Sequence, residues 1–126
     1  HYVKDHTRWQ SNKTKYDPCP AGWRVPDGGG NNIWDKAGFT DEVPYDDVKM
    51  GTSLELGNSV TAWYPYAGYR YCLEAFNTVS NLGEGFYWSC TGSGDLAFNV
   101  RLFIDRINTH DMSGQAYGYS VRCQRD

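Results

Sequence analysis

The chain has 126 residues, enough for one domain with a single hydrophobic core but too few for two. Its formal net charge of -3 argues against nucleic acid and anionic membranes as partners, because both are normally held by a basic surface. No apolar run approaches the roughly 18 residues of a spanning helix, so we expect no membrane insertion by this domain.

The chain starts with a polar stretch, and we expect residues 1–15 to be a lead-in segment from an upstream domain and 16–126 to be the folded domain. It contains nothing like an export signal, so we expect it to be part of a longer exported protein. Pro18 and Pro20 flank Cys19 and prevent a helix or a central strand from continuing there. Residues 21–26 then predict a short strand, and 33–39 at most a short helix.

An acidic, turn-prone stretch covers residues 40–58, and we interpret it as a solvated surface. Its carboxylates lack the alternate spacing and the final glutamate of a calcium-binding loop. An aromatic stretch follows at 62–70. Its rings either pack in the core or form a stacking platform for sugars, and we favour core packing, above all for Tyr69 and for Trp88 further along the chain.

The C-terminal half contains the clearest strand signal. Apolar residues at 96, 98, 100, 102 and 104 alternate with a second set that includes Asn99, Arg101 and Asp105. This period of two predicts a half-buried antiparallel strand. We expect a polar turn at 108–114 and further strands at 119–124 and 87–90, so that the three strands form a small meander.

Four cysteines, Cys19, Cys72, Cys90 and Cys123, form an even set without any CxxC pair. Zinc ligands usually come in closely spaced pairs, so a structural zinc site is disfavoured. The set predicts two disulfides in an exported protein, and three connectivities are open. The alternative is four buried free thiols in a reducing compartment.

Four blocks of the sequence resemble the FISUMP (major paralogous domain) family and occur in that family's order. They read YDPCPAGWRVP at 16–26, YPYAGYR at 64–70, YWSCT at 87–91 and YSVRC at 119–123. The resemblance implies an α+β, C-type-lectin-like fold of small antiparallel sheets, short helices and long loops. Such domains are C-terminal modules of exported, often fimbrillin-like, bacterial surface proteins and lipoproteins, which implies an extracellular location at the cell surface or outer membrane.

The resemblance also implies a disulfide from Cys19 to Cys123, because the first and last cysteines of this fold join the two ends of the domain. Cys72 and Cys90 then remain, and we infer that they pair with each other. The lectins of the wider fold bind calcium through Glu-Pro-Asn or Gln-Pro-Asp and Trp-Asn-Asp motifs, which this sequence lacks. We therefore expect no metal and no cofactor.

Catalytic motifs are absent from the sequence, and we expect no enzyme. There is no Gly-x-Ser-x-Gly elbow, and three scattered histidines do not form a metal-binding triad. The formylglycine-generating enzymes, which share the fold, are the remote enzymatic alternative. Their chemistry needs two neighbouring cysteines that bind copper as thiolates, a role open here only to Cys72 and Cys90.

We expect a non-catalytic binding or adhesion module whose ligand is a glycan or a surface protein. The alternative is a structural or assembly domain of a pilus-like protein or multidomain lipoprotein. The expected binding residues lie in two irregular stretches, 71–85 and 105–114, and offer rings, amides and charged groups. They are Tyr71, Phe76, Asn77, Asn81, Glu84, Asp105, His110 and Asp111.

Overall fold

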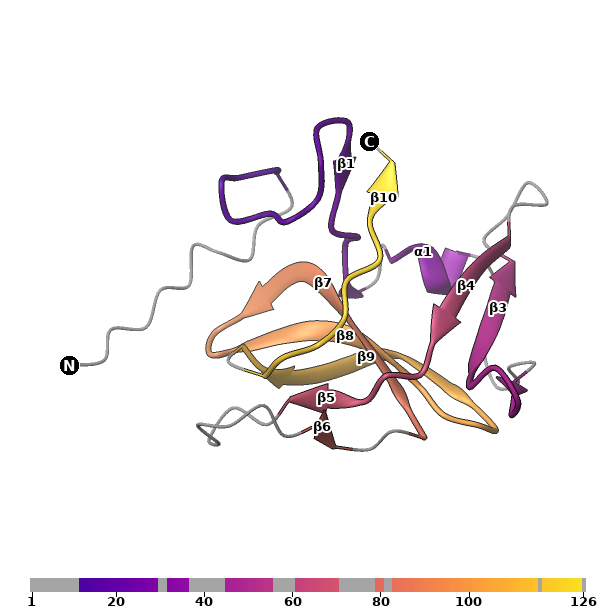
Figure 1. Cartoon of the computed structure of the whole chain (residues 1–126). Helices are drawn as coiled ribbons and strands as arrows, with labels where there is room; N and C mark the ends of the chain where they lie inside the picture. Colours follow the sequence, from indigo (N-terminus) through magenta and orange to yellow (C-terminus); the bar gives the residue numbers. More distant parts are fainter. Residues whose placement is uncertain are drawn as a thin grey trace.

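The computed structural model describes residues 12–29, 32–36, 45–55, 61–70, 79–80, 83–115 and 117–125 (Figure 1). This part of the chain folds into small antiparallel sheets with very little helix, so the expected α+β class holds only for its β component. The expected helix at 33–39 is found as the single turn α1 (Ile33–Lys36), and residues 37–40 lie outside the described residues.

The described strands form four separate sheets, ordered β1-β10, β2-β3-β4, β5-β6 and β7-β8-β9. The bounds of these strands are β1 Trp23–Arg24, β2 Tyr45–Asp46, β3 Gly51–Glu55, β4 Thr61–Pro65, β5 Tyr69–Arg70, β6 Val79–Ser80, β7 Gly85–Ser93, β8 Leu96–Leu102, β9 Ile107–Gly114 and β10 Gln124–Arg125.

The meander β7-β8-β9 is the central sheet of the molecule (Figure 1). A two-residue turn joins β7 to β8, and Gly94 occupies its first position with φ of 59°, where a hairpin turn of this kind favours glycine. The predicted strands at 87–90 and 96–104 are thus found, although β8 ends at Leu102. Ile104 is 60% exposed because it lies in the next turn, which the amide of Phe103 closes by donating to the carbonyl of Arg106 at 2.8 Å.

The third strand of the meander differs from our prediction. The segment expected as a polar turn at 108–114 is strand β9, in which Ile107 and Thr109 are buried while Asn108 and His110 are exposed. We predicted a turn because most side chains of this segment are polar, although one face of the strand is buried. Residues 119–124, expected as a strand of the meander, form only an isolated parallel bridge between Ser120 and Tyr87 at the free edge of β7, and Gln124 then begins β10.

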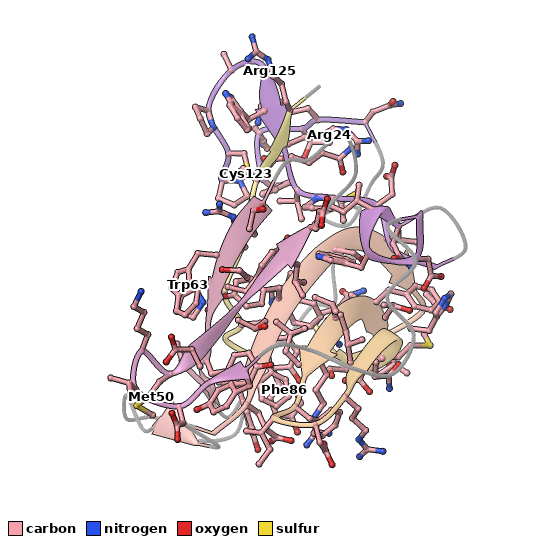
Figure 2. All side chains as sticks on the ribbon, turned by 90° about the vertical axis from the view of Figure 1, so that its right-hand side faces the viewer. Arg24, Met50, Trp63, Phe86, Cys123 and Arg125 are labelled. Carbon is pink, nitrogen blue, oxygen red and sulfur yellow. A yellow bond between two sulfur atoms is a disulfide. The ribbon has the colours of Figure 1, made fainter. Side chains whose placement is uncertain are left out.

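One face of the central sheet contributes to the hydrophobic core. Tyr87, Val100 and Leu102 pack there with α1 and with the sheet β2-β3-β4, which contributes Leu54 and Tyr64. Figure 2 shows β3 and β4 in front of the central sheet, with side chains between them. The sheet β2-β3-β4 was not predicted, because its first two strands fall in the stretch that we had interpreted as a solvated surface.

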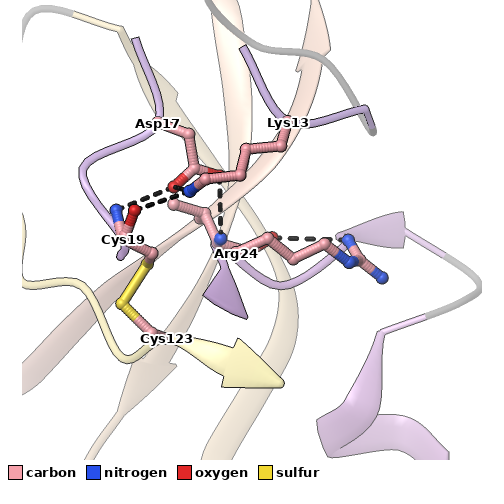
Figure 3. The surroundings of a disulfide bond; sticks show 6 residues. Lys13, Asp17, Cys19, Arg24 and Cys123 are labelled. Carbon is pink, nitrogen blue, oxygen red and sulfur yellow. Dashed lines mark hydrogen bonds and ion pairs between the residues drawn. A yellow bond between two sulfur atoms is a disulfide. The ribbon is translucent and has the colours of Figure 1, made fainter. Parts of the chain in front are cut away.

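The two ends of the described chain are joined covalently. Cys19 and Cys123 form a disulfide, as the resemblance implied, with their Cα atoms 5.9 Å apart (Figure 3). Strands β1 and β10 pair beside it, Trp23 opposite Arg125. Asp17 orders the approach to the disulfide, because its carboxylate accepts hydrogen bonds from Lys13 and from the amides of Cys19 and Val25.

The expected second disulfide is not formed, because Cys90 is a buried free thiol. Its side chain packs inward with Cys19, Val25 and Cys123, and its Sγ lies 3.3 Å from a carboxylate oxygen of Asp27. The thiol therefore belongs to the small core beside the terminal disulfide. Cys72, its expected partner, lies outside the described residues.

Candidate functional site

The face of the central sheet opposite the core carries a cluster of aromatic rings. Phe86 and Trp88 alternate with core residues along β7, and Tyr119 crosses above both, with ring centroids 5.0 Å from Phe86 and 4.4 Å from Trp88. Tyr69 and Tyr117 complete the cluster, at 5.0 Å from Phe86 and 5.9 Å from Tyr119 respectively. We call these five side chains the ring cluster.

Backbone hydrogen bonds fix the segment around Ser120 at the free edge of β7. The amide of Trp88 donates to the carbonyl of Ser120, and the amide of Ser120 donates to the carbonyl of Phe86, each at 3.0 Å. The hydroxyl of Tyr119 lies 2.7 Å from Oγ of Ser113 on β9. Because β7 and β9 both hold this segment, the ring of Tyr119 at the centre of the cluster is held in place before any ligand arrives.

A hollow of about 350 Å³ opens between the ring cluster and the outer face of β8 and β9. Its walls combine aromatic, cationic and acidic side chains. They include Tyr69, Phe86, Arg101, Asp111, Tyr117 and Tyr119. We call this the outer hollow.

Arg101, on β8, forms part of the wall of the outer hollow. Its Nη2 donates to both carboxylate oxygens of Glu84, at 3.0 and 3.1 Å, and its guanidinium lies 5.0 Å from the centre of the Phe86 ring. The ion pair and the ring contact hold the guanidinium in one position. Glu84 is one of the residues expected at a binding site, whereas Arg101 was expected only as the polar face of a strand.

Asp111 brings a poorly solvated carboxyl group to the same wall. Burial raises its pKa above the ordinary value, against the lowering effects of the Arg101 charge and of a hydrogen bond with Asn99. A half-buried carboxyl group of this kind gains free energy from a hydrogen-bond donor that a ligand provides. Asp111 was expected at a binding site in a turn, and the structure places it on strand β9.

Asn99 lies behind this wall and is only 1% exposed. Its Nδ2 donates to Oγ of Ser113 at 3.0 Å, but its Oδ1 is buried without a hydrogen-bond partner, as is Nε of Arg101. Each such atom costs about 1–3 kcal/mol of stability. These two unpaired polar atoms on the outer face of β8 make the fold less stable than it would be if both were hydrogen-bonded. Such groups are common where a surface serves binding.

The remaining expected site residues do not join the outer hollow. Asp105 lies exposed in the turn between β8 and β9. The structure gives no description of Tyr71, Phe76, Asn77 and Asn81, which lie outside the described residues. Tyr69, which lines the outer hollow, comes just before the expected binding stretch 71–85, and Glu84, which pairs with Arg101 in the wall of the hollow, comes near the end of that stretch.

His110 takes part in a different cluster. Its Nε2 is hydrogen-bonded to the carboxylate of Asp35 on α1, and Oγ1 of Thr109 donates to the other oxygen of the same carboxylate. Burial would raise the pKa of Asp35, but these hydrogen bonds outweigh burial and lower it. The Nδ2 of Asn32 also donates to the carbonyl of Thr109, at 3.3 Å. The cluster fastens α1 to β9, so His110 has a structural role here.

A second hollow, of about 300 Å³, lies between residues 12–18 and β7. Its walls are mainly apolar and include Trp88, Cys90 and Val121. Its one acidic group, Asp17, is already hydrogen-bonded to Lys13 and to two backbone amides. This hollow offers a polar ligand fewer partners than the outer hollow does.

No family model, curated protein or solved structure matches the chain. Among the described residues, no group of three or more His, Cys, Asp or Glu side chains is placed to hold a metal ion. No helix in the same part of the chain is long and apolar enough to cross a membrane.

Proposed function

We propose that the chain is a non-catalytic saccharide-binding module of an exported surface protein, and that the outer hollow is its binding site. The main observation behind the proposal is that packed aromatic rings and charged side chains line the same hollow. Rings suit the apolar faces of sugars, and carboxylates, amides and guanidinium groups bind their hydroxyls.

We further propose that the fold is C-type-lectin-like, of the FISUMP type. The disulfide between Cys19 and Cys123 and the pairing of β1 with β10 support this, because that fold joins its two ends. The position of the outer hollow supports it as well. In such a fold a long loop precedes the last strands, and Glu84, which pairs with Arg101 in the wall of the outer hollow, comes from the stretch 71–85 that we expected to be that loop.

The terminal disulfide also supports export, because such bonds persist in oxidising compartments. The ligand is then a glycan presented at the surface of the bacterium or of a neighbouring cell. Binding uses hydrogen bonds and ring stacking, so the proposal requires neither a metal ion nor a cofactor.

A screen of immobilised oligosaccharides tests the proposal, followed by titration calorimetry on the saccharides that bind. Tyr117→Ala removes a ring that lines the outer hollow, and we expect it to weaken binding by about tenfold or more. Trp23→Ala is the matched control, because Trp23 is an exposed ring on β1, and we expect unchanged affinity.

Circular dichroism melting curves show whether each variant remains folded. Equal losses for the two folded variants would place the site elsewhere. If the folded wild-type protein bound no oligosaccharide in the screen, the binding proposal would fail and a structural or assembly role would be favoured.

A further inference from the structure

A third hollow, of about 460 Å³, adjoins the outer hollow. It is lined by Arg101, Phe103, Arg106, Ile107, Asn108 and Thr109, so Arg101 forms part of the wall of both. Its walls are mainly polar and come from the end of β8, the following turn and the start of β9. We call it the arginine hollow.

Two guanidinium groups gather at one ring in the arginine hollow. Arg101 lies 4.7 Å from the centre of the Phe103 ring, and Arg106 lies 4.1 Å from it. Bringing two like charges together is unfavourable unless a negative charge is present. The shared ring provides only part of the compensation, because a cation and a ring attract each other less strongly than opposite charges do.

Only one of the two positive charges is balanced within the described part of the chain. Glu84 pairs with Arg101, whereas no described carboxylate forms an ion pair with Arg106, not even Asp105 beside it. Asn108 adds a hydrogen-bond donor, because its Oδ1 already accepts from the amide of His110 and its amino group remains. The arginine hollow thus offers a net positive charge and neutral donors.

We propose that the ligand is an acidic saccharide, and that its carboxylate or sulfate group binds Arg106 in the arginine hollow while a neighbouring sugar ring occupies the outer hollow. This inference rests on the proposed saccharide binding. Arg101 contributes to both subsites, and its pairing with Glu84 keeps it in place between them. A guanidinium group suits this role because its planar fork of donors matches a carboxylate or a sulfate.

The test uses pairs of oligosaccharides that share a backbone and differ in charge: cello-oligosaccharides with their C6-oxidised uronate forms, and dextran oligomers with their sulfated forms. We expect the acidic member of a pair to bind the wild-type chain about tenfold more tightly than the neutral one, with an affinity that falls as salt rises. Arg106→Gln should abolish this preference and leave the affinity for neutral saccharide unchanged.

Arg125→Gln is the matched control. Arg125 is also exposed, and its guanidinium lies 5.8 Å from the centre of the Trp23 ring. Figure 2 places it at the end of the molecule opposite Phe86, which lines the outer hollow, and Figure 1 shows β10 at the end opposite the turn between β8 and β9. We expect this variant to keep the preference for acidic saccharides, which separates a local effect of Arg106 from a change in net charge.

The outcomes distinguish this inference from the proposed function. If neutral and acidic oligosaccharides bound with equal affinity, the acidic subsite would be ruled out, whereas the proposed saccharide binding would still hold. Equal loss of the preference in Arg106→Gln and Arg125→Gln would show an effect of net charge alone and overturn the subsite too. If no member of any pair bound, both proposals would fail together.

Discussion

Asp17 shows how one carboxylate organises the segment around the terminal disulfide. Burial would raise the pKa of this group, but hydrogen bonds from Lys13 and from the amides of Cys19 and Val25 outweigh burial and lower it (Figure 3). The unfolded chain then binds a proton more readily than the folded chain does. The stabilisation is therefore complete above the ordinary aspartate pKa and is lost as the pH falls through the lowered pKa.

We predict that Asp17→Asn lowers the free energy of unfolding at pH 7 by about 1.5–3 kcal/mol, the range for hydrogen bonds to a charged group. The variant should also lose less stability than the wild type between pH 5 and pH 2. Urea unfolding at a series of pH values measures both effects. Asp47→Asn is the control, since Asp47 is exposed, and a loss of similar size there would contradict the assignment.

Cys90 is a second residue whose chemistry is set by its surroundings. Burial and the neighbouring Asp27 carboxylate raise the pKa of its thiol to about 12. Only the thiolate attacks alkylating reagents or disulfides. Cys90 should thus stay unreactive although it packs against the terminal disulfide.

We predict that iodoacetamide at pH 8 leaves Cys90 unmodified in the folded protein and modifies it after unfolding in urea. Peptide mapping by mass spectrometry measures the modification of Cys90 separately from that of Cys72. Modification of the folded protein at the rate of an exposed thiol would contradict the prediction. Recovery of a peptide in which Cys90 is joined to Cys72 would restore the disulfide that the sequence suggested.

Among the structural elements, β1, β7 and β8 were predicted from the sequence, whereas β9 and the sheet β2-β3-β4 were not. β8 was found because apolar residues recur at every second position along it, and Val100 and Leu102 are buried as expected. β9 was missed because residues such as Asn108 and Asp111 also suit a turn. Its strand structure depends on pairing with β8, which provides partners for its backbone.

The candidate site could be predicted only where it depends on local composition. Glu84 and Asp111 were expected because charged groups in irregular stretches often serve binding. Arg101 and Tyr117 were missed, because they meet only when the segment after β9 packs beside β7. No local sequence pattern indicates that packing.

The link between β1 and β10 is the element-scale feature that we expect to contribute most to stability. Each strand has only two residues, so backbone pairing alone is weak, and the disulfide closes a separation of 104 residues. We predict that the double variant Cys19→Ser, Cys123→Ser loses about 2–5 kcal/mol of unfolding free energy. Replacing both cysteines leaves no unpaired partner at the bridge.

Urea unfolding at pH 7 measures this loss, and the single variant Cys90→Ser is its control. That change removes a free thiol from the same small core without opening the bridge. A double variant as stable as the wild type would show that β1 and β10 hold together without the disulfide.

At the scale of the whole molecule, the first strand of the central sheet, β7, is covered on both faces. All six residues from Gly85 to Cys90 are buried, as expected for a strand with packing on each side. One cover is the hydrophobic core, and the other is formed by the rings of Tyr69 and Tyr119. The sequence indicated one buried face, because Asn99 and Arg101 make the outer face of the neighbouring strand β8 polar.

The disulfide that joins the two ends of the domain has a mechanical consequence. Tension along the segments that flank the disulfide enters at Cys19 and leaves at Cys123, whose Cα atoms are 5.9 Å apart. The load passes through a covalent bond and leaves the intervening residues unstretched. In the surface protein that we propose, the outer hollow would therefore keep its shape when both ends of the domain are pulled.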